Sequence, residues 1–168
     1  MIPFEPHAFA ELPKEFHNLQ DWQGLQNPSL VIENSQLKQE LGIESIDGQK
    51  LLDIFNGSLK VETLKPLSMV YSGHQFGQYV EQLGDGRGLL LGQIKANEEL
   101  IDIHLKGAGK TPYSRFGDGR AVLRSVIREY LCGEAMHALS IPTSRALMII
   151  GSDEMVIREK SESAAMLA

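Results

Sequence analysis

The chain has only one cysteine among its 168 residues, Cys132, so it cannot form an internal disulfide. A protein without disulfides is compatible with a reducing compartment. The sequence also lacks any run of about 18 consecutive apolar residues, the length that a membrane-spanning helix needs. Its first residues, MIPFEPHAFAELPKEF, hold no basic stretch followed by an apolar run, so they do not form a secretory signal. We therefore expect a cytoplasmic protein with no membrane partner.

Basic residues are fewer than acidic ones. The chain has 22 Asp and Glu residues against 16 Lys and Arg residues, which gives a formal net charge of -6 at pH 7. This balance argues against a nucleic-acid partner held by a general basic surface. A local cluster of arginine and lysine could still hold one nucleotide.

The composition is that of a folded protein. Hydrophobic residues make up 42% of the chain and charged residues 23%, which is ordinary for a globular protein. A length of 168 residues suits one domain better than two, so we expect residues 1–168 to form a single domain. Strand-like and helix-like segments alternate without an internal repeat, which indicates an α+β fold.

The first half of the chain shows a strand, two short helices and a loop. Residues 29–32 are typical of a strand, and Asn34 or Ser35 caps a helix that ends at Gly42. Residues 48–55 predict a second helix, with Gly57 after it. Residues 64–78, which contain YSGHQFG, show no clear period and predict a functional loop.

The second half predicts a sheet and one long helix. Residues 79–83, 89–94 and 101–105 suggest an antiparallel meander. Residues 121–139 repeat apolar side chains at helical spacing, which predicts an amphipathic helix with a buried stripe. The stripe of this helix comprises Leu123, Val126, Ile127, Tyr130, Leu131, Ala135 and Leu139.

Residues 146–150 and 155–158 suggest a hairpin around GSDE. The tail after it is either a disordered terminus or the end of a fragment.

Two glycine-rich loops are the first candidates for a functional site. Gly84, Gly86 and Gly88 begin like a dinucleotide-binding fingerprint, but a strand-like run follows where that fingerprint needs a helix. A glycine-rich turn between strands can instead lie over phosphates, or it can be a plain hairpin turn. The second loop contains GAGKT, which resembles the end of a phosphate-binding P-loop. We do not take it as one, because the first glycine of that motif is replaced by His104, and Pro112 directly follows Thr111.

Lys106 closes the third strand-like run, so its ammonium group can point into a cleft under the first glycine loop. Glu129 lies beside the apolar stripe of the long helix, where an unpaired carboxylate would be costly to bury. A strand lysine paired with a helix glutamate beneath a glycine loop is how kinase-like folds hold ATP phosphates. Alternatively, Lys106 is solvated and Glu129 pairs at the surface with Arg124 or Arg128.

Asp118 and Gly119 lie just before the long helix. Backbone amides at the helix start could bind an anion there, or Asp118 could simply cap the helix. Arg115, Arg120 and Arg124 add positive charge, which fits a triphosphate and equally fits ordinary ion pairs.

Two other residues carry a weaker signal. His74 has no companions at metal-ligand spacing, so we predict no metal site. Cys132 lies beside the apolar stripe and is interpreted as a core residue with no base to activate it.

Two long stretches together resemble the selenoprotein O family of pseudokinases. They are YSGHQFGQYVEQLGDGRGLLLGQI and HLKGAGKTPYSRFGDGRAVLRSVIREYLCGEAMHALSIPTSRAL, and the likeness is strong over residues 71–159. Lys110 departs from the family pattern, in which a proline is expected. The resemblance implies a kinase-like N-lobe with an antiparallel sheet and a long αC-like helix, preceded by short N-terminal helices.

The resemblance also implies an activity. ATP would bind inverted relative to protein kinases, so that AMP is transferred to a Ser, Thr or Tyr hydroxyl of a protein substrate. Mg²⁺, or Mn²⁺ in its place, would share the phosphate charge. Lys106 would hold phosphate while paired with Glu129, within a nucleotide-binding set that the resemblance implies. That set is Gly84, Gly86, Arg87, Lys106, Asp118, Gly119 and Glu129.

The catalytic base and the metal ligands of the family are expected beyond Ala168. The chain alone is therefore expected to be inactive and to contain no catalytic residue or metal ligand. Two alternatives stay open at this point. One is a non-catalytic nucleotide-binding or regulatory module, and the other is a conventional phosphotransferase.

Overall fold

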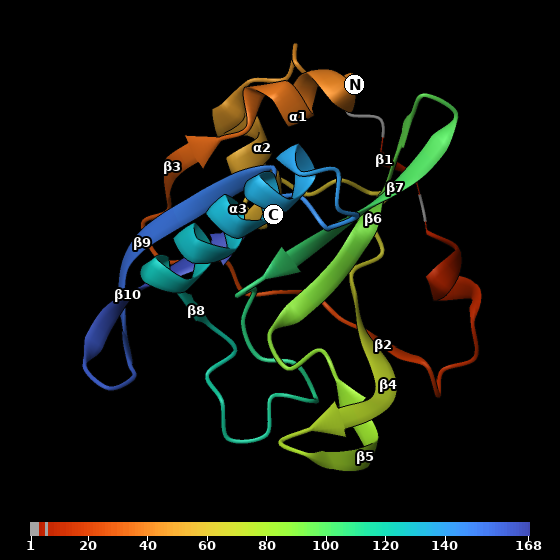
Figure 1. The fold of residues 1–168 in the computed structure, drawn as a ribbon, viewed down its shortest axis with the longest axis vertical. Helices are drawn as coiled ribbons and strands as arrows, with labels where there is room; N and C mark the ends of the chain where they lie inside the picture. Colours follow the sequence, from red (N-terminus) through yellow and green to blue (C-terminus); the bar gives the residue numbers. More distant parts are fainter. Residues whose placement is uncertain (1–3, 6) are drawn as a thin grey trace.

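One antiparallel sheet organises the protein (Figure 1). The computed structural model describes residues 4–5 and 7–168, and ten strands within them join this sheet. Seven of them follow one another in the order β2-β4-β6-β7-β10-β9-β3. In addition, β1 pairs with β6, β5 with β4 and β8 with β10. The few helices and the antiparallel strands confirm the α+β prediction. The strands are β1 (Phe4–Glu5), β2 (His17–Leu19), β3 (Ser29–Glu33), β4 (Leu67–Gln75), β5 (Gln78–Gly84), β6 (Gly88–Ala96), β7 (Glu99–Lys106), β8 (Ala121–Val122), β9 (Met148–Ile157) and β10 (Ser161–Leu167). The helices are η1 (Ala8–Glu11), α1 (Ser35–Glu40), α2 (Gly48–Phe55) and α3 (Leu123–Ala138).

Side chains of β9 and β10 alternate between two hydrophobic cores. Met148 and Ile150 belong to the larger core, whereas Ile149 between them belongs to the smaller one. In β10, Met166 and Leu167 divide in the same way. Figure 1 shows the reason, because α3 covers one face of these strands and α2 lies on the other. Burial on both faces explains the continuous apolar runs of the two strands.

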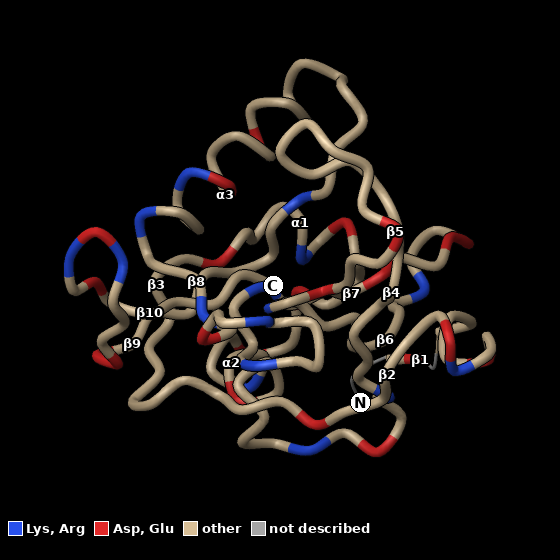
Figure 2. The backbone as a smooth tube through the Cα atoms, turned by 90° about the horizontal axis from the view of Figure 1, so that it is seen from below, with Lys and Arg blue, Asp and Glu red and all other residues tan. Residues whose placement is uncertain are grey.

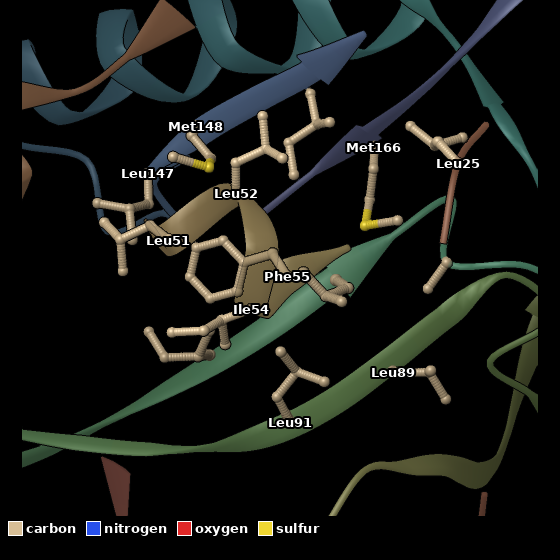
Figure 3. Close-up of a cluster of buried hydrophobic side chains, with 14 of the residues drawn as sticks. Leu25, Leu51, Leu52, Ile54, Phe55, Leu89, Leu91, Leu147, Met148 and Met166 are labelled. Carbon is tan, nitrogen blue, oxygen red and sulfur yellow. The ribbon is translucent and has the colours of Figure 1, made fainter. Parts of the chain in front are cut away.

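Helix α2 supplies the centre of the larger core. Its cap is Asp47, whose carboxylate accepts hydrogen bonds from the amides of Gln49 and Lys50 at 2.8 and 3.3 Å. Leu51 and Phe55 are fully buried, and Figure 3 shows this helix between β6 and β7 on one side and β9 and β10 on the other. The structure confirms both short helices and the strand before them.

Residues 64–78 are not a loop, so that prediction is wrong. They contain strand β4, which turns into β5 through Phe76 and Gly77. Both turn residues have positive φ, 54° and 78°, as a two-residue hairpin turn of the twist-matched type requires. Asn-Gly or Asp-Gly usually marks such a turn, and a phenylalanine in the first position conceals it from sequence reading.

The predicted meander is only partly right. β6 and β7 pair around Asn97 and Glu98, as the pattern indicated. β5 pairs with β4 and not with β6, however, and β4 in turn pairs with β6. Residues 84–88 therefore cross from one strand pair to another, which rules out the plain hairpin turn.

The hairpin around GSDE and the disordered tail are both wrong. β9 runs unbroken from Met148 to Ile157 and then turns into β10. β10 lies between β7 and β9, and its residues 164–167 are buried. A short Ser, Glu and Ala stretch has little strand propensity of its own, so its place in the sheet depends on neighbours that burial supplies.

Helix α3 is present, but the predicted buried stripe is only partly right. Leu131 and Leu139 are 61% and 69% exposed, and Cys132, predicted in the core, is exposed as well. Helical spacing shows which residues share a face, but it does not show whether another element covers that face. The α3 residues that pack on the smaller core all lie in the first half of the helix: Leu123, Val126 and Tyr130.

Charges of both signs are interspersed along the chain. Figure 2 shows lysines and arginines scattered among aspartates and glutamates along the backbone. Arg145, for example, joins Glu40 of α1 to Glu134 of α3. Among the helices that the structure describes, none has both the length and the apolar character to cross a membrane.

Phe55 tests the larger core. Its ring is fully buried and meets Phe4 edge to face, with the centroids 6.4 Å apart. We expect Phe55→Ala to lower the free energy of unfolding by about 3–5 kcal/mol, because buried apolar contacts are lost and a cavity is left. Urea denaturation followed by circular dichroism measures this loss. Leu59→Ala, at a side chain that is 40% exposed, is the control and should cost under about 1 kcal/mol. Equal losses in both variants would contradict the assigned core.

Candidate functional site

The two glycine-rich loops lie against each other and border a cavity of about 700 Å³. The first loop, residues 84–88, joins β5 to β6, and the second, residues 107–120, joins β7 to β8. Both loops lie in the lower part of the molecule in Figure 1. Segments distant in the sequence therefore meet at one place. Five of the predicted site residues line this cavity: Gly84, Gly86, Arg87, Asp118 and Gly119.

Side chains of the second loop hold the backbone of the first. Ser114 Oγ donates to the Gly86 carbonyl at 2.6 Å. A Cβ atom on Gly84 would overlap the ring of Tyr113, and one on Gly86 would lie 3.0 Å from the Tyr113 carbonyl oxygen. These glycines are therefore needed for the packing of one loop on the other.

Asp85 of the first loop makes hydrogen bonds to the second loop and to β4. Its backbone carbonyl accepts a hydrogen bond from Thr111 Oγ1 at 2.6 Å, and its carboxylate accepts one from the Met69 amide at 3.1 Å. The first loop is thus bound both to the second loop and to β4.

Asp118 does not cap the long helix, so that alternative is wrong. The N-cap of α3 is Val122, and no side chain caps it. Asp118 instead accepts hydrogen bonds from the Arg158 guanidinium at 2.7 and 2.9 Å and from the Arg120 amide at 2.9 Å. The hydrogen bond from Arg158 is the main reason why the pKa of Asp118 lies below its usual value.

Gly119 stands where only glycine fits. Its φ is 75°, and a Cβ atom would overlap the backbone of Gly109. The Gly109 amide donates to the Gly119 carbonyl at 3.1 Å, which closes the second loop on itself. A side chain at this position would open the loop.

Two of the three arginines around the second loop are engaged in ion pairs. Arg120 is only 5% exposed, and its guanidinium donates to Glu154 at 2.8 and 3.1 Å. Arg124 pairs with Glu162 at 2.6 Å. For these two, the ordinary ion-pair alternative is therefore the one that the structure shows. Arg115 donates to Gln75 at 3.3 Å.

Lys106 and Glu129 form an ion pair that joins β7 to α3. The structure thus shows the strand-to-helix pair and not a surface pair of Glu129 with Arg124 or Arg128. The Lys106 and Glu129 side chains are 30% and 43% exposed. They border a second hollow of about 880 Å³, which also includes Gly86 and Arg87. The seven predicted residues therefore lie around the first loop, but in two adjoining hollows.

Arg87 lines both hollows. None of the ion pairs among the described residues involves its guanidinium. Its side chain is also exposed. Arg87 is therefore a cation that the fold itself does not neutralise.

The structure also locates two weaker sequence candidates, GAGKT and His74. GAGKT, at residues 107–111, is followed by turns and not by a helix, which agrees with its rejection as a P-loop. His74 is exposed on β4 and meets Tyr79 edge to face at 5.4 Å. Within residues 4–5 and 7–168, no group of three or more His, Cys, Asp or Glu side chains is placed to hold a metal ion.

Sequence reasoning missed Arg158 and Tyr113. Arg158 lies 40 residues from Asp118, and only the β9–β10 hairpin brings it to the cavity. Tyr113 stands out only when its ring is seen against Gly84. Neither residue carries a motif or spacing that could have identified it.

The Asp118–Arg158 pair makes stability depend on pH in a defined direction. The pKa of Asp118 is lowered from 3.8 in the folded state, so the stabilisation is present above 3.8 and is lost as pH falls through the lowered value. We expect Asp118→Asn to cost the same free energy of unfolding at all values above about pH 5, and less below pH 4. Urea denaturation across this range measures the cost. A cost that does not shrink in acid would contradict the role of this pair.

Known proteins share the sequence over almost its whole length. The family model of protein adenylyltransferase SelO matches residues 2–168. Protein nucleotidyltransferase YdiU of Vibrio parahaemolyticus is 54% identical over 162 residues, which are 96% of this chain and 33% of that protein. Protein nucleotidyltransferase YdiU of Stutzerimonas stutzeri is 52% identical over 165 residues, 96% of this chain and 34% of that protein.

The chain spans about a third of the length of these curated relatives. The family match nevertheless covers both glycine-rich loops, the Lys106–Glu129 pair and all the strands of the sheet. It confirms the resemblance that the two long sequence stretches indicated. The chain belongs to the protein adenylyltransferase SelO family.

Proposed function

We propose that this chain is the ATP-binding part of a protein adenylyltransferase, which transfers AMP from ATP to Ser, Thr or Tyr hydroxyl groups of other proteins. The observation that carries the proposal is the Lys106–Glu129 ion pair beside a glycine-rich loop that bears Arg87. Kinase-like folds hold ATP phosphates with this combination of groups. The printed names of the relatives, protein nucleotidyltransferase, support transfer of a nucleotidyl group.

The same observation supports a kinase-like N-lobe. β6 and β7 follow the glycine-rich loop, and β7 ends at the lysine that pairs with α3. In protein kinases the lysine likewise lies on a strand and its glutamate on a helix. We extend the proposal to this architecture for β6, β7, α3, β9 and β10.

The residues around the first loop suit a polyphosphate. Four arginines but only one acidic residue line the first cavity. Arg120 and Arg158 are neutralised within the fold, whereas Arg87 is available for phosphate oxygens, which its planar guanidinium binds well. Lys106 has three N–H donors, so it can serve Glu129 and a phosphate together.

The residues proposed to bind the nucleotide have three kinds of role. Lys106 and Arg87 place positive charge where negative charge develops during transfer. Glu129 holds the Lys106 ammonium in one position, so no reorganisation is needed when ATP arrives. Gly84 and Gly86 have no side chain that would keep phosphates away from the backbone. The cavity beside them, lined by Asp118 and Gly119, is available for the rest of the nucleotide.

Mg²⁺, or Mn²⁺, supplies further charge neutralisation to a bound polyphosphate. The described residues offer no cluster of acidic ligands for it. Following the family resemblance, we propose that the protein ligands of the metal and the catalytic base lie outside these residues. On this proposal the chain alone takes part in ATP binding but does not transfer AMP. We also propose that it works in the cytoplasm, where its lone cysteine stays reduced.

ATP binding tests the role of Lys106. A suitable protein is a chimera in which residues 1–168 replace the matched third of the Vibrio parahaemolyticus relative. We expect Lys106→Ala to weaken the ATP affinity of the chimera by about 10–100-fold, because a charge-assisted hydrogen bond is lost. Isothermal titration calorimetry with Mg²⁺ measures the affinity. Lys60→Ala, at an exposed lysine outside both hollows, should bind as the unchanged chimera does. Unchanged affinity in Lys106→Ala would overturn the assignment.

The position of a label in ATP separates the reactions. We expect the chimera to transfer label from the α-phosphate to a protein substrate and none from the γ-phosphate, because AMP and not phosphate is transferred. Autoradiography after gel electrophoresis measures both, with the unaltered Vibrio protein as the control. Label from the γ-phosphate would instead establish a conventional phosphotransferase. No transfer by the chimera, beside transfer by the control, would favour a binding or regulatory module.

A further inference from the structure

Two loop tips at the rim of the first cavity carry phenylalanines that the fold leaves in solvent. Phe76, at the tip of the β4–β5 hairpin, is 97% exposed, and Phe116, in the second glycine-rich loop, is fully exposed. The Arg115 guanidinium donates to the Gln75 side chain at 3.3 Å, so the two tips lie side by side. Figure 1 shows the hairpin and the loop together in the lower part of the molecule.

The backbone at both tips is strained. Phe76 and Arg115 each have a φ of 54°, a region that residues with large side chains rarely adopt. Glycine or asparagine would adopt it at lower cost. The Phe76 ring is in solvent, and Arg115 makes one hydrogen bond, to Gln75, but takes part in none of the ion pairs among the described residues. Contacts within the described residues therefore do not explain these two residues, and strain of this kind is concentrated at functional sites.

Both tips also lack acidic residues in an acidic protein. The chain has 22 Asp and Glu residues, yet none occurs in residues 63–80 or 103–117, and Asp118, the next residue of the second loop, is paired with Arg158. Arg115 adds a positive charge at the point where the two tips meet. A surface with this charge is complementary to an acidic partner. The two phenyl rings beside it suit an apolar or aromatic side chain of the same partner.

The size of the surface favours a polypeptide. Phe116 lines the first cavity, whereas Phe76 lies outside it. A partner that touches both rings must therefore extend out of the cavity that we assign to the nucleotide. A protein segment whose hydroxyl group enters the cavity mouth can contact both rings and still extend out of the cavity.

We propose that Phe76, Phe116 and Arg115 form the docking surface for the protein substrate and recognise an acidic segment that carries an apolar side chain next to the modified hydroxyl. This inference rests on the proposed function, because it assigns the substrate class of the same site. The substrate is held at the rim, and the nucleotide loops lie behind it.

Peptide binding by the 168-residue chain tests the surface. The probe is a short fluorescein-labelled peptide in which glutamates flank a Phe-Thr pair, and its control has lysine in place of each glutamate. We expect the acidic peptide to bind and the basic one to bind at least about tenfold more weakly, because Arg115 would repel it. Fluorescence anisotropy at low ionic strength measures both affinities.

The strained positions provide variants that separate docking from folding. We expect Phe76→Asn and Arg115→Gly each to weaken binding of the acidic peptide by about tenfold or more, since they remove a central contact. Their melting temperatures should not fall, because asparagine and glycine accept positive φ. Phe16→Ala, at a half-exposed phenylalanine outside this surface, should bind the peptide as the unchanged chain does. Native-like binding by Phe76→Asn and Arg115→Gly would overturn the proposal, and so would equal binding of the two peptides.

ATP titration of the chimera keeps the two proposals apart. Phe76→Asn with normal ATP affinity and lost peptide binding supports docking. Phe76→Asn with lost ATP affinity and normal peptide binding overturns it and assigns the tips to the nucleotide. If Lys106→Ala leaves ATP binding unchanged while the peptide results hold, the ATP site assignment fails and the docking surface stands.

Discussion

The buried guanidinium of Arg120 joins three segments that lie far apart in the sequence. It donates to the carbonyls of Gln23 and Gly24 near the N-terminus at 2.7 and 2.9 Å, and to Glu154 in β9. A buried charge left without its partner costs several kcal/mol, so these segments are held together as a unit. Since Arg120 ends the second glycine-rich loop, that loop is fixed to the body of the protein. The first glycine-rich loop packs on the second. The position of both cavity walls therefore depends on the contacts of Arg120.

The glycines of the candidate site have two uses that do not exclude each other. Gly84 and Gly86 let the first loop approach Tyr113, and Gly119 lets the second loop fold back on Gly109. A loop whose glycines face its neighbour is held rigidly, and a rigid loop can present its backbone to a ligand at little entropic cost. The structural need for glycine and the proposed contact with phosphate therefore support the same sequence.

The sequence was most informative where local chemistry decides the structure. Apolar residues at helical spacing before Gly57 were enough to predict α2, and the strand position of Lys106 with Glu129 on a helix was enough to suggest their pairing. Prediction from the sequence failed where a local signal was absent or misleading. A phenylalanine stands in the β4–β5 turn, and the strand β10 consists of residues with little strand propensity.

By itself, the sequence determined the α+β class, the family and the short helices, and it suggested the residues of the candidate site. Only the tertiary structure decided that β5 pairs with β4, that β10 enters the middle of the sheet, and that Arg158 reaches Asp118. The reason is physical. Propensity, capping and periodicity act over a few neighbouring residues, whereas strand partners, ion pairs over long separations and the covering of a helix face depend on which distant surfaces are buried together.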